Sequence, residues 1–231
     1  MQLPSSNPES ITALFKQVLD DRKKSPSDKA SDEITTSVMH FLTIIKQNQE
    51  HNHVLAKSNV TEIGDFVLQI LQRIIKESGG MTPELANPLT ISIALWIAEN
   101  HGEISMLEPV VDALSRMANQ TQEHSELAAL SRIASEIIDA CEISIKNDLD
   151  NANPGRPWRV LNINHGIMAT RSHNPDIMEE AFQSLIKRLP QDAPGFFKEG
   201  MSEMDRLGYP EHVREVMQRY NDQWNKPKTL H

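Results

Sequence analysis

The residues of this chain that are best suited to bind a charged group lie in one segment, residues 151–175. The segment contains no Asp or Glu, although the chain as a whole has a formal net charge of -9. Guanidinium groups match carboxylates and phosphates in geometry, and Trp beside Arg is typical of interface hot spots. The sequence therefore predicts a binding site for a partner protein or a small anion, formed by Arg156, Trp158, Arg159, His165, Arg171 and His173.

The same arginines have a second interpretation, as partners in internal ion pairs. Residues 1–150 contain 12 Lys and Arg against 22 Asp and Glu, whereas the remaining residues are nearly balanced at 11 against 10. Arginines that follow such an acidic part can pair with its carboxylates and join the two parts of the chain. The sequence leaves docking and internal pairing open as alternatives.

We find no arrangement of residues that is typical of catalysis or metal binding. No two histidines have the three- or four-residue spacing that places them on one face of a helix, and the single cysteine excludes a cysteine-rich zinc cage. Cys141 lies between Ile137 and Ile145 on an apolar stripe, which predicts a buried, unreactive thiol. There is no nucleophile elbow, phosphate loop or dinucleotide fingerprint. We therefore expect no enzyme activity, no metal and no cofactor.

The elements that must position these residues are helices. Apolar residues recur at three- or four-residue spacing along the chain, which predicts an all-α protein of about ten helices without a strand. Asn7-Pro8 and Asn174-Pro175 predict helix starts, because Asn caps a helix and Pro fits its first turn. Gly208 predicts a helix end, since glycine adopts the left-handed conformation that closes many helices.

Further local patterns predict particular boundaries. Asn87-Pro88 predicts the start of a helix, and Ser105 with Glu108 predicts a capping box. The apolar stripe over residues 121–149 is compatible with one long helix. Asn153-Pro154-Gly155 places proline and glycine where a type II turn favours them.

The lengths of the helices and of their connections predict antiparallel αα-hairpins. We expect an irregular α-α superhelix of the HEAT or armadillo kind, with a compact irregular helical bundle as the alternative. The predicted organisation is an acidic helical part (1–150, about six helices), a Pro/Gly connector (151–157), a helical part (158–224, about four helices) and a tail (225–231). We expect these parts to form one continuous structural unit.

Composition limits the classes of partner. The acidic balance argues against general nucleic-acid binding. No segment has the twenty or so apolar residues that a membrane-spanning helix needs, and the N-terminus does not resemble a signal peptide. We therefore expect a soluble, cytoplasmic protein with no nucleic-acid or membrane partner, and a homodimer is left open.

Two functions remain as hypotheses. The first is a non-enzymatic scaffold or interaction module that binds an acidic or amphipathic segment of another protein. The second is a sensor of a small anion, with a pocket between helices that is floored by Trp158, Phe196 or Phe197 and rimmed by the arginines. The last helices contain several methionines, which either line an adaptable groove or fill gaps in the core. These methionines are Met168, Met178, Met201, Met204 and Met217.

Overall fold

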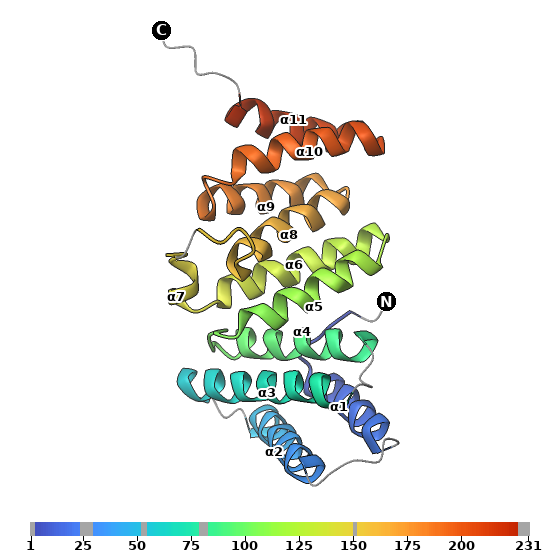
Figure 1. The fold of residues 1–231 in the computed structure, drawn as a ribbon, viewed down its shortest axis with the longest axis vertical. Helices are drawn as coiled ribbons and strands as arrows, with labels where there is room; N and C mark the ends of the chain where they lie inside the picture. Colours follow the sequence, from blue (N-terminus) through green and yellow to red (C-terminus); the bar gives the residue numbers. More distant parts are fainter. Residues whose placement is uncertain (1–2, 24–29, 52–54, 79–82, 150–151, 226–231) are drawn as a thin grey trace. The chain divides into compact units, whose positions relative to one another are not determined.

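The computed structural model of the chain describes residues 3–23, 30–51, 55–78, 83–149 and 152–225. Within them the protein is all-α, as predicted (Figure 1). These residues form eleven helices and one isolated bridge between Ile104 and Cys141. No described helix has the length and apolar character needed to cross a membrane. The helices are α1 (Pro8–Lys23), α2 (Ala30–His51), α3 (Lys57–Ser78), α4 (Pro83–Glu99), α5 (Leu107–Gln120), α6 (His124–Ala140), α7 (Ile143–Lys146), α8 (Pro157–Arg171), α9 (Pro175–Arg188), α10 (Ala193–Leu207) and α11 (Glu211–Asn225).

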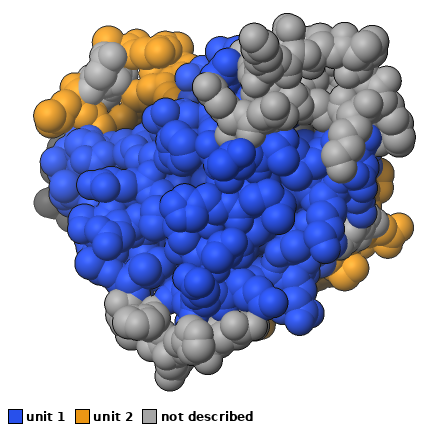
Figure 2. Space-filling model, turned by 90° about the horizontal axis from the view of Figure 1, so that it is seen from below, with its two compact units in different colours: residues 1–120, 136–147 blue, residues 121–135, 148–231 orange. Residues whose placement is uncertain are grey.

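The chain divides into two compact units, which Figure 2 shows in separate colours. Unit 1 consists of residues 1–120 and 136–147, and unit 2 consists of residues 121–135 and 148–231. The start of α6 therefore belongs to unit 2 and its last turn to unit 1. The described residues of the expected connector, 152–157, lie within unit 2.

Unit 1 is built around α4. Every residue of this helix from Ala86 to Ile97 is buried, and α1, α3 and α5 pack against it. A helix that is covered on all sides is mostly apolar around its whole circumference, and here only Asn87, Thr90 and Ser92 are polar among the buried residues. Phe41 of α2 meets the Trp96 ring edge-on, with the ring centroids 5.4 Å apart, an arrangement that the ring quadrupoles favour.

The start of α4 differs from the sequence prediction. The helix begins at Pro83, and Pro88 lies inside it, so the predicted start at Asn87-Pro88 is wrong. Pro83 fits the first turn, where its missing N–H costs nothing, whereas Pro88 withholds one backbone hydrogen bond from the helix. The burial of α4 on all sides outweighs that loss.

Two other local predictions are also wrong. Residues 121–149 do not form one helix, because α6 ends at Ala140 and the backbone of Ile104 pairs with the chain there. The Ile104 amide donates to the Ala140 carbonyl at 2.8 Å, and the Ile104 carbonyl accepts from the Glu142 amide at 3.0 Å. The capping box is not formed either: α5 begins at Leu107, and the Ser105 hydroxyl donates to the Asp65 carboxylate instead.

Unit 2 contains the antiparallel helix pairs α8–α9 and α10–α11, with α9 also against α11. Its core is a cluster of aromatic and aliphatic side chains in which Phe182 meets Phe196, Phe197 and Tyr220 edge-on, at centroid distances of 5.2–5.6 Å. The Tyr220 hydroxyl reaches the Glu179 carboxylate at 2.5 Å, which satisfies the polar end of a buried ring. Aromatic packing therefore fixes α9, α10 and α11 against one another.

The helix ends predicted at Asn7, Asn174 and Gly208 are confirmed. The Asn7 side chain accepts from the Glu9 amide, the Asn174 side chain accepts from the Asp176 and Ile177 amides, and Gly208 ends α10 with a φ of 66°. The turn at Asn153-Pro154-Gly155 is present, with the Arg156 amide donating to the Asn153 carbonyl. It is not a type II turn, because Gly155 lacks the positive φ that this type requires.

Candidate functional site

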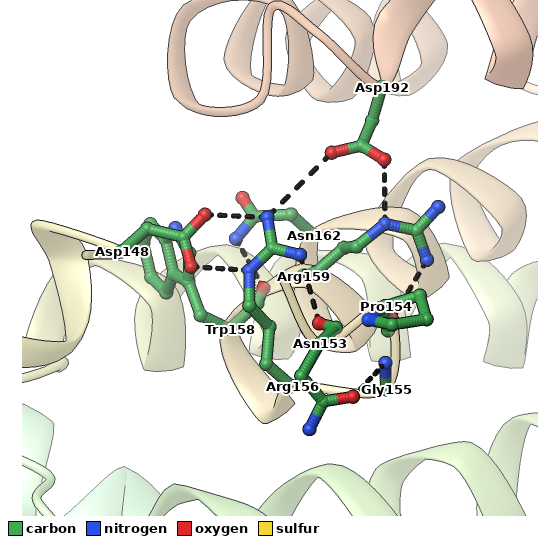
Figure 3. Close-up of polar contacts among 9 residues, drawn as sticks. All are labelled: Asp148, Asn153, Pro154, Gly155, Arg156, Trp158, Arg159, Asn162 and Asp192. Carbon is green, nitrogen blue, oxygen red and sulfur yellow. Dashed lines mark hydrogen bonds and ion pairs between the residues drawn. The ribbon is translucent and has the colours of Figure 1, made fainter. Parts of the chain in front are cut away.

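The guanidinium group of Arg156 is bound by a carboxylate of its own unit (Figure 3). Its Nε donates to Asp148 Oδ1 at 2.5 Å and its Nη2 donates to Asp148 Oδ2 at 2.7 Å. A third nitrogen, Nη1, donates to the Asn153 carbonyl at 3.0 Å. The two side chains are only 13% and 17% exposed. This bidentate pair compensates the charge of Arg156 and holds the turn before α8 in place.

Arg159 is paired in a similar way. Its Nε donates to Asp192 Oδ1 at 2.6 Å, and its Nη1 donates to the Pro154 carbonyl at 3.0 Å (Figure 3). Asp192 immediately precedes α10, but its side chain does not cap that helix. Its second oxygen lies 3.9 Å from Arg156 Nη2 instead. One carboxylate therefore faces both arginines and ties the start of α8 to the start of α10.

Trp158 and His165 point into the protein. They are 4% and 5% exposed, so neither presents a surface to a partner. Burial, together with the positive charge of Arg188, lowers the pKa of His165 to about 4. His165 is therefore a neutral side chain of the core at neutral pH.

Arg171 and His173 lie where α8 ends. Arg171 Nη2 donates to the Thr121 carbonyl at 2.8 Å. His173 has a φ of 55°, and its ring stacks on His124 with the centroids 3.9 Å apart. Burial lowers the pKa of His173, and the neighbouring His124 and His212 lower it further. The sequence-predicted residues are thus spread along α8 and do not form one charged surface.

A groove of about 540 Å³ runs between α8 and α10 in unit 2, and it takes in two of the six predicted residues, Arg159 and Arg171. Phe196 lines it, as expected for a floor, whereas Trp158 and Phe197 are buried elsewhere in the unit. The apolar part of its lining consists of Ile163, Ile167, Phe196, Met204, Leu207 and Met217. The lining of the groove is therefore more apolar than polar, and its charged residues are Arg159, Arg171, Asp192, Glu199 and Glu203.

Glycines shape the groove on both sides. A Cβ at Gly195 would meet no atom within 4 Å, so this position of α10 borders open space. A Cβ at Gly166 would lie 2.7 Å from Phe196 Cζ, so the absence of a side chain there lets the Phe196 ring approach α8. One glycine leaves the groove open and the other positions an aromatic ring that lines it.

The lining residues of each helix follow a four-residue spacing. On α8 they include Arg159, Ile163, Ile167 and Arg171, and on α10 they include Gly195, Glu199, Glu203 and Leu207. Ile167 and Leu207 are 41% and 54% exposed, so each row presents one large aliphatic side chain to solvent beside the groove. Sequence reasoning missed the α10 row, although its spacing is visible in the sequence, because nothing local shows which faces of two helices lie opposite each other.

The charges at the rims are unequal. The α10 rim carries Glu199 and Glu203, both exposed. The α8 side carries Arg159 and Arg171, of which Arg159 is paired with Asp192. At one end, burial raises the pKa of the Tyr209 phenol; Arg171 lowers it in part, and Glu203 raises it. The lining as a whole therefore contains three carboxylates and two guanidinium groups.

A second hollow of about 550 Å³ lies in unit 1, and its character is different. It is lined by several carboxylates, among them Glu99, Glu136 and Asp139, together with Lys57 and Lys146. Burial raises the pKa of Glu136, and the nearby Glu99 raises it further. In the described part of the chain, no three His, Cys, Asp or Glu residues gather in a way that could hold a metal ion. The apolar groove of unit 2 is accordingly the stronger candidate site.

Comparisons with known proteins give no indication of function, so the evidence for function comes from the groove. No family model, no curated protein and no solved structure matches this chain.

Proposed function

We propose that the chain is a non-enzymatic interaction module, and that the groove between α8 and α10 binds an amphipathic helical segment of a partner protein. The observation that carries the proposal is the pair of four-residue rows that face one groove, Arg159 to Arg171 on α8 and Gly195 to Leu207 on α10. Rows at this spacing form the ridges of a helix surface, and a third helix packs by placing its own ridge between two others. Of the two kinds of segment expected from the sequence, acidic or amphipathic, the apolar lining favours the amphipathic one.

The dimensions of the groove fit such a segment. The row from Arg159 to Arg171 extends for about 18 Å at the rise of an α-helix, which corresponds to about three helical turns of a partner. The volume of about 540 Å³ lies within the range of roughly 300–1,000 Å³ that is usual for binding pockets. We therefore expect three or four apolar side chains of the partner, spaced along one face of its helix, to fill the groove.

The arrangement of the helices in unit 2 is consistent with the superhelix predicted from the sequence. We propose that α8–α9 and α10–α11 are successive units of an irregular HEAT/armadillo-like stack. In such a stack the first helices of neighbouring units lie side by side and line one continuous surface. The groove is lined mainly by α8 and α10, which are the first helices of the two pairs.

A plug in the groove tests the function. Gly195→Trp places a large side chain in the open space beside α10, and Gln183→Trp places the same side chain on the exposed face of α9 as a matched control. A displayed library of sixteen-residue amphipathic helices is selected on the wild-type chain, and each enriched sequence is measured on all three proteins. We expect a loss of affinity of about tenfold or more with Gly195→Trp and none with Gln183→Trp. A library that gives no binder sensitive to the plug would refute the proposal, provided that circular dichroism shows both variants folded.

A small anionic ligand is the second candidate. At one end of the apolar groove, Arg171 and the Tyr209 phenol both line the wall, and a cation with a hydroxyl beside an apolar floor is a common arrangement for orienting a carboxylate. Thermal-shift measurements with aromatic and aliphatic carboxylates test this candidate. Stabilisation that disappears in Gly195→Trp would favour it, and an unchanged melting temperature at millimolar ligand would exclude it.

A further inference from the structure

The charges around the groove indicate which amphipathic segment it accepts, and this inference rests on the proposed function of the groove. We infer that the partner helix is basic along the flank that faces α10, with Lys or Arg at two positions one turn apart. The carrying observation is that Glu199 and Glu203 lie four residues apart on one rim and are exposed. Residues four apart on a helix are neighbours on its surface, so the two carboxylates form a short acidic ridge.

The acidic ridge is only weakly compensated within the protein. In the described part of the chain no side chain forms an ion pair or hydrogen bond with Glu199. Glu203 pairs with Arg206, but these side chains are 52% and 65% exposed and lie on the same helix. Exposed pairs of this kind contribute little and are readily exchanged for another cation. A basic side chain of a partner can therefore approach both carboxylates.

The opposite side of the groove does not offer an equivalent attraction for an acidic flank. Arg159 already bonds Asp192 at 2.6 Å and the Pro154 carbonyl at 3.0 Å. Arg171 bonds the Thr121 carbonyl at 2.8 Å at the far end of α8. Acidic residues along a bound helix would approach Glu199 and Glu203 while finding Arg159 already neutralised. Repulsion between like charges disfavours binding of an acidic flank, so Glu199 and Glu203 both attract a basic partner helix and reject an acidic one.

Peptides that differ only in flank charge test the inference. A helix that is selected on the wild-type chain and is sensitive to Gly195→Trp is synthesised in three forms, with Lys, Gln or Glu at the two flank positions. We expect the Lys form to bind about tenfold more tightly than the Glu form at low salt, with the difference shrinking as salt is raised. The double variant Glu199→Lys/Glu203→Lys is expected to reverse the order.

A matched control separates local from overall charge. Glu180→Lys/Glu215→Lys changes the net charge by the same amount at exposed positions outside the groove, and it should leave the order of the three peptides unchanged. Equal binding of the three forms to the wild-type chain would overturn the inference, while their shared sensitivity to Gly195→Trp would keep the proposed function. Tighter binding of the Glu form would overturn the inference as well. A library without plug-sensitive binders would instead remove the proposed function and the inference together.

Discussion

The buried histidine of α8 makes the stability of unit 2 depend on pH in a defined direction. His165 is 5% exposed, and burial followed by the charge of Arg188 lowers its pKa from 6.5 to about 4. In the unfolded chain the imidazole regains its ordinary pKa and binds a proton more readily than in the folded chain. The contribution of His165 to folding stability is therefore fully present above pH 6.5, and it is lost as the pH falls from 6.5 to 4.

The magnitude follows from the difference between the two pKa values. A shift of one unit corresponds to about 1.4 kcal/mol, so the fall from 6.5 to about 4 amounts to about 3 kcal/mol in total. At pH 5, where the unfolded imidazole is mostly protonated and the folded one is mostly neutral, the loss is about 2 kcal/mol. This is a large fraction of the stability of a typical domain.

The assay is urea unfolding at pH 7 and pH 5, followed by tryptophan fluorescence, since Trp158 lies on the same helix as His165. His165→Leu removes the titrating group, so its loss of stability between the two pH values should be about 2 kcal/mol smaller than that of the wild-type chain. His40→Leu, at an exposed position of α2, is the matched control and should behave like the wild type. Equal losses in the wild-type chain and His165→Leu would refute the reasoning.

Three further predictions concern two glycines beside the groove, one ion pair and the buried cysteine. Gly166→Ala should destabilise the protein by about 1–3 kcal/mol, because its Cβ would lie 2.7 Å from Phe196 Cζ. Gly195→Ala adds its Cβ in open space and should stabilise the protein by about 0.5–1 kcal/mol. Urea unfolding that ranks the two variants the other way would contradict this prediction. A double-mutant cycle with Arg156→Ala and Asp148→Ala should give a coupling energy of about 1–3 kcal/mol, and additive effects would mean that their bidentate pair contributes no stability. The Cys141 thiol, which is 1% exposed, should react with a thiol reagent only when urea unfolds the protein, and rapid labelling of the folded chain would show that the site opens.

Local signals in the sequence were sufficient where a feature depends on neighbouring residues. The caps at Asn7 and Asn174 and the left-handed end at Gly208 use side chains and backbone groups a few residues apart. The burial of Cys141 was likewise predicted, because its apolar neighbours recur with the period of a helix. The all-α class follows from the same period along the chain.

Local signals failed where a distant segment competes for the same groups. The helix predicted over residues 121–149 ends at Ala140 because Ile104, far away in the sequence, takes the backbone hydrogen bonds on both sides of Cys141. Pro88 reads as a helix start, yet it lies within α4 because the packing of neighbouring helices around α4 outweighs one lost hydrogen bond.

The candidate site divides in the same way. The sequence alone identified Arg159, Arg171 and Phe196 as residue types suited to a binding surface, because charge and aromatic character are properties of single residues. Only the tertiary structure decided that Asp192 neutralises Arg159, that Trp158 and His165 are buried, and that α10 faces α8 across a groove. Period and capping are set by contacts within a few residues, whereas a groove is set by which helix faces meet, and that depends on the packing of the whole unit.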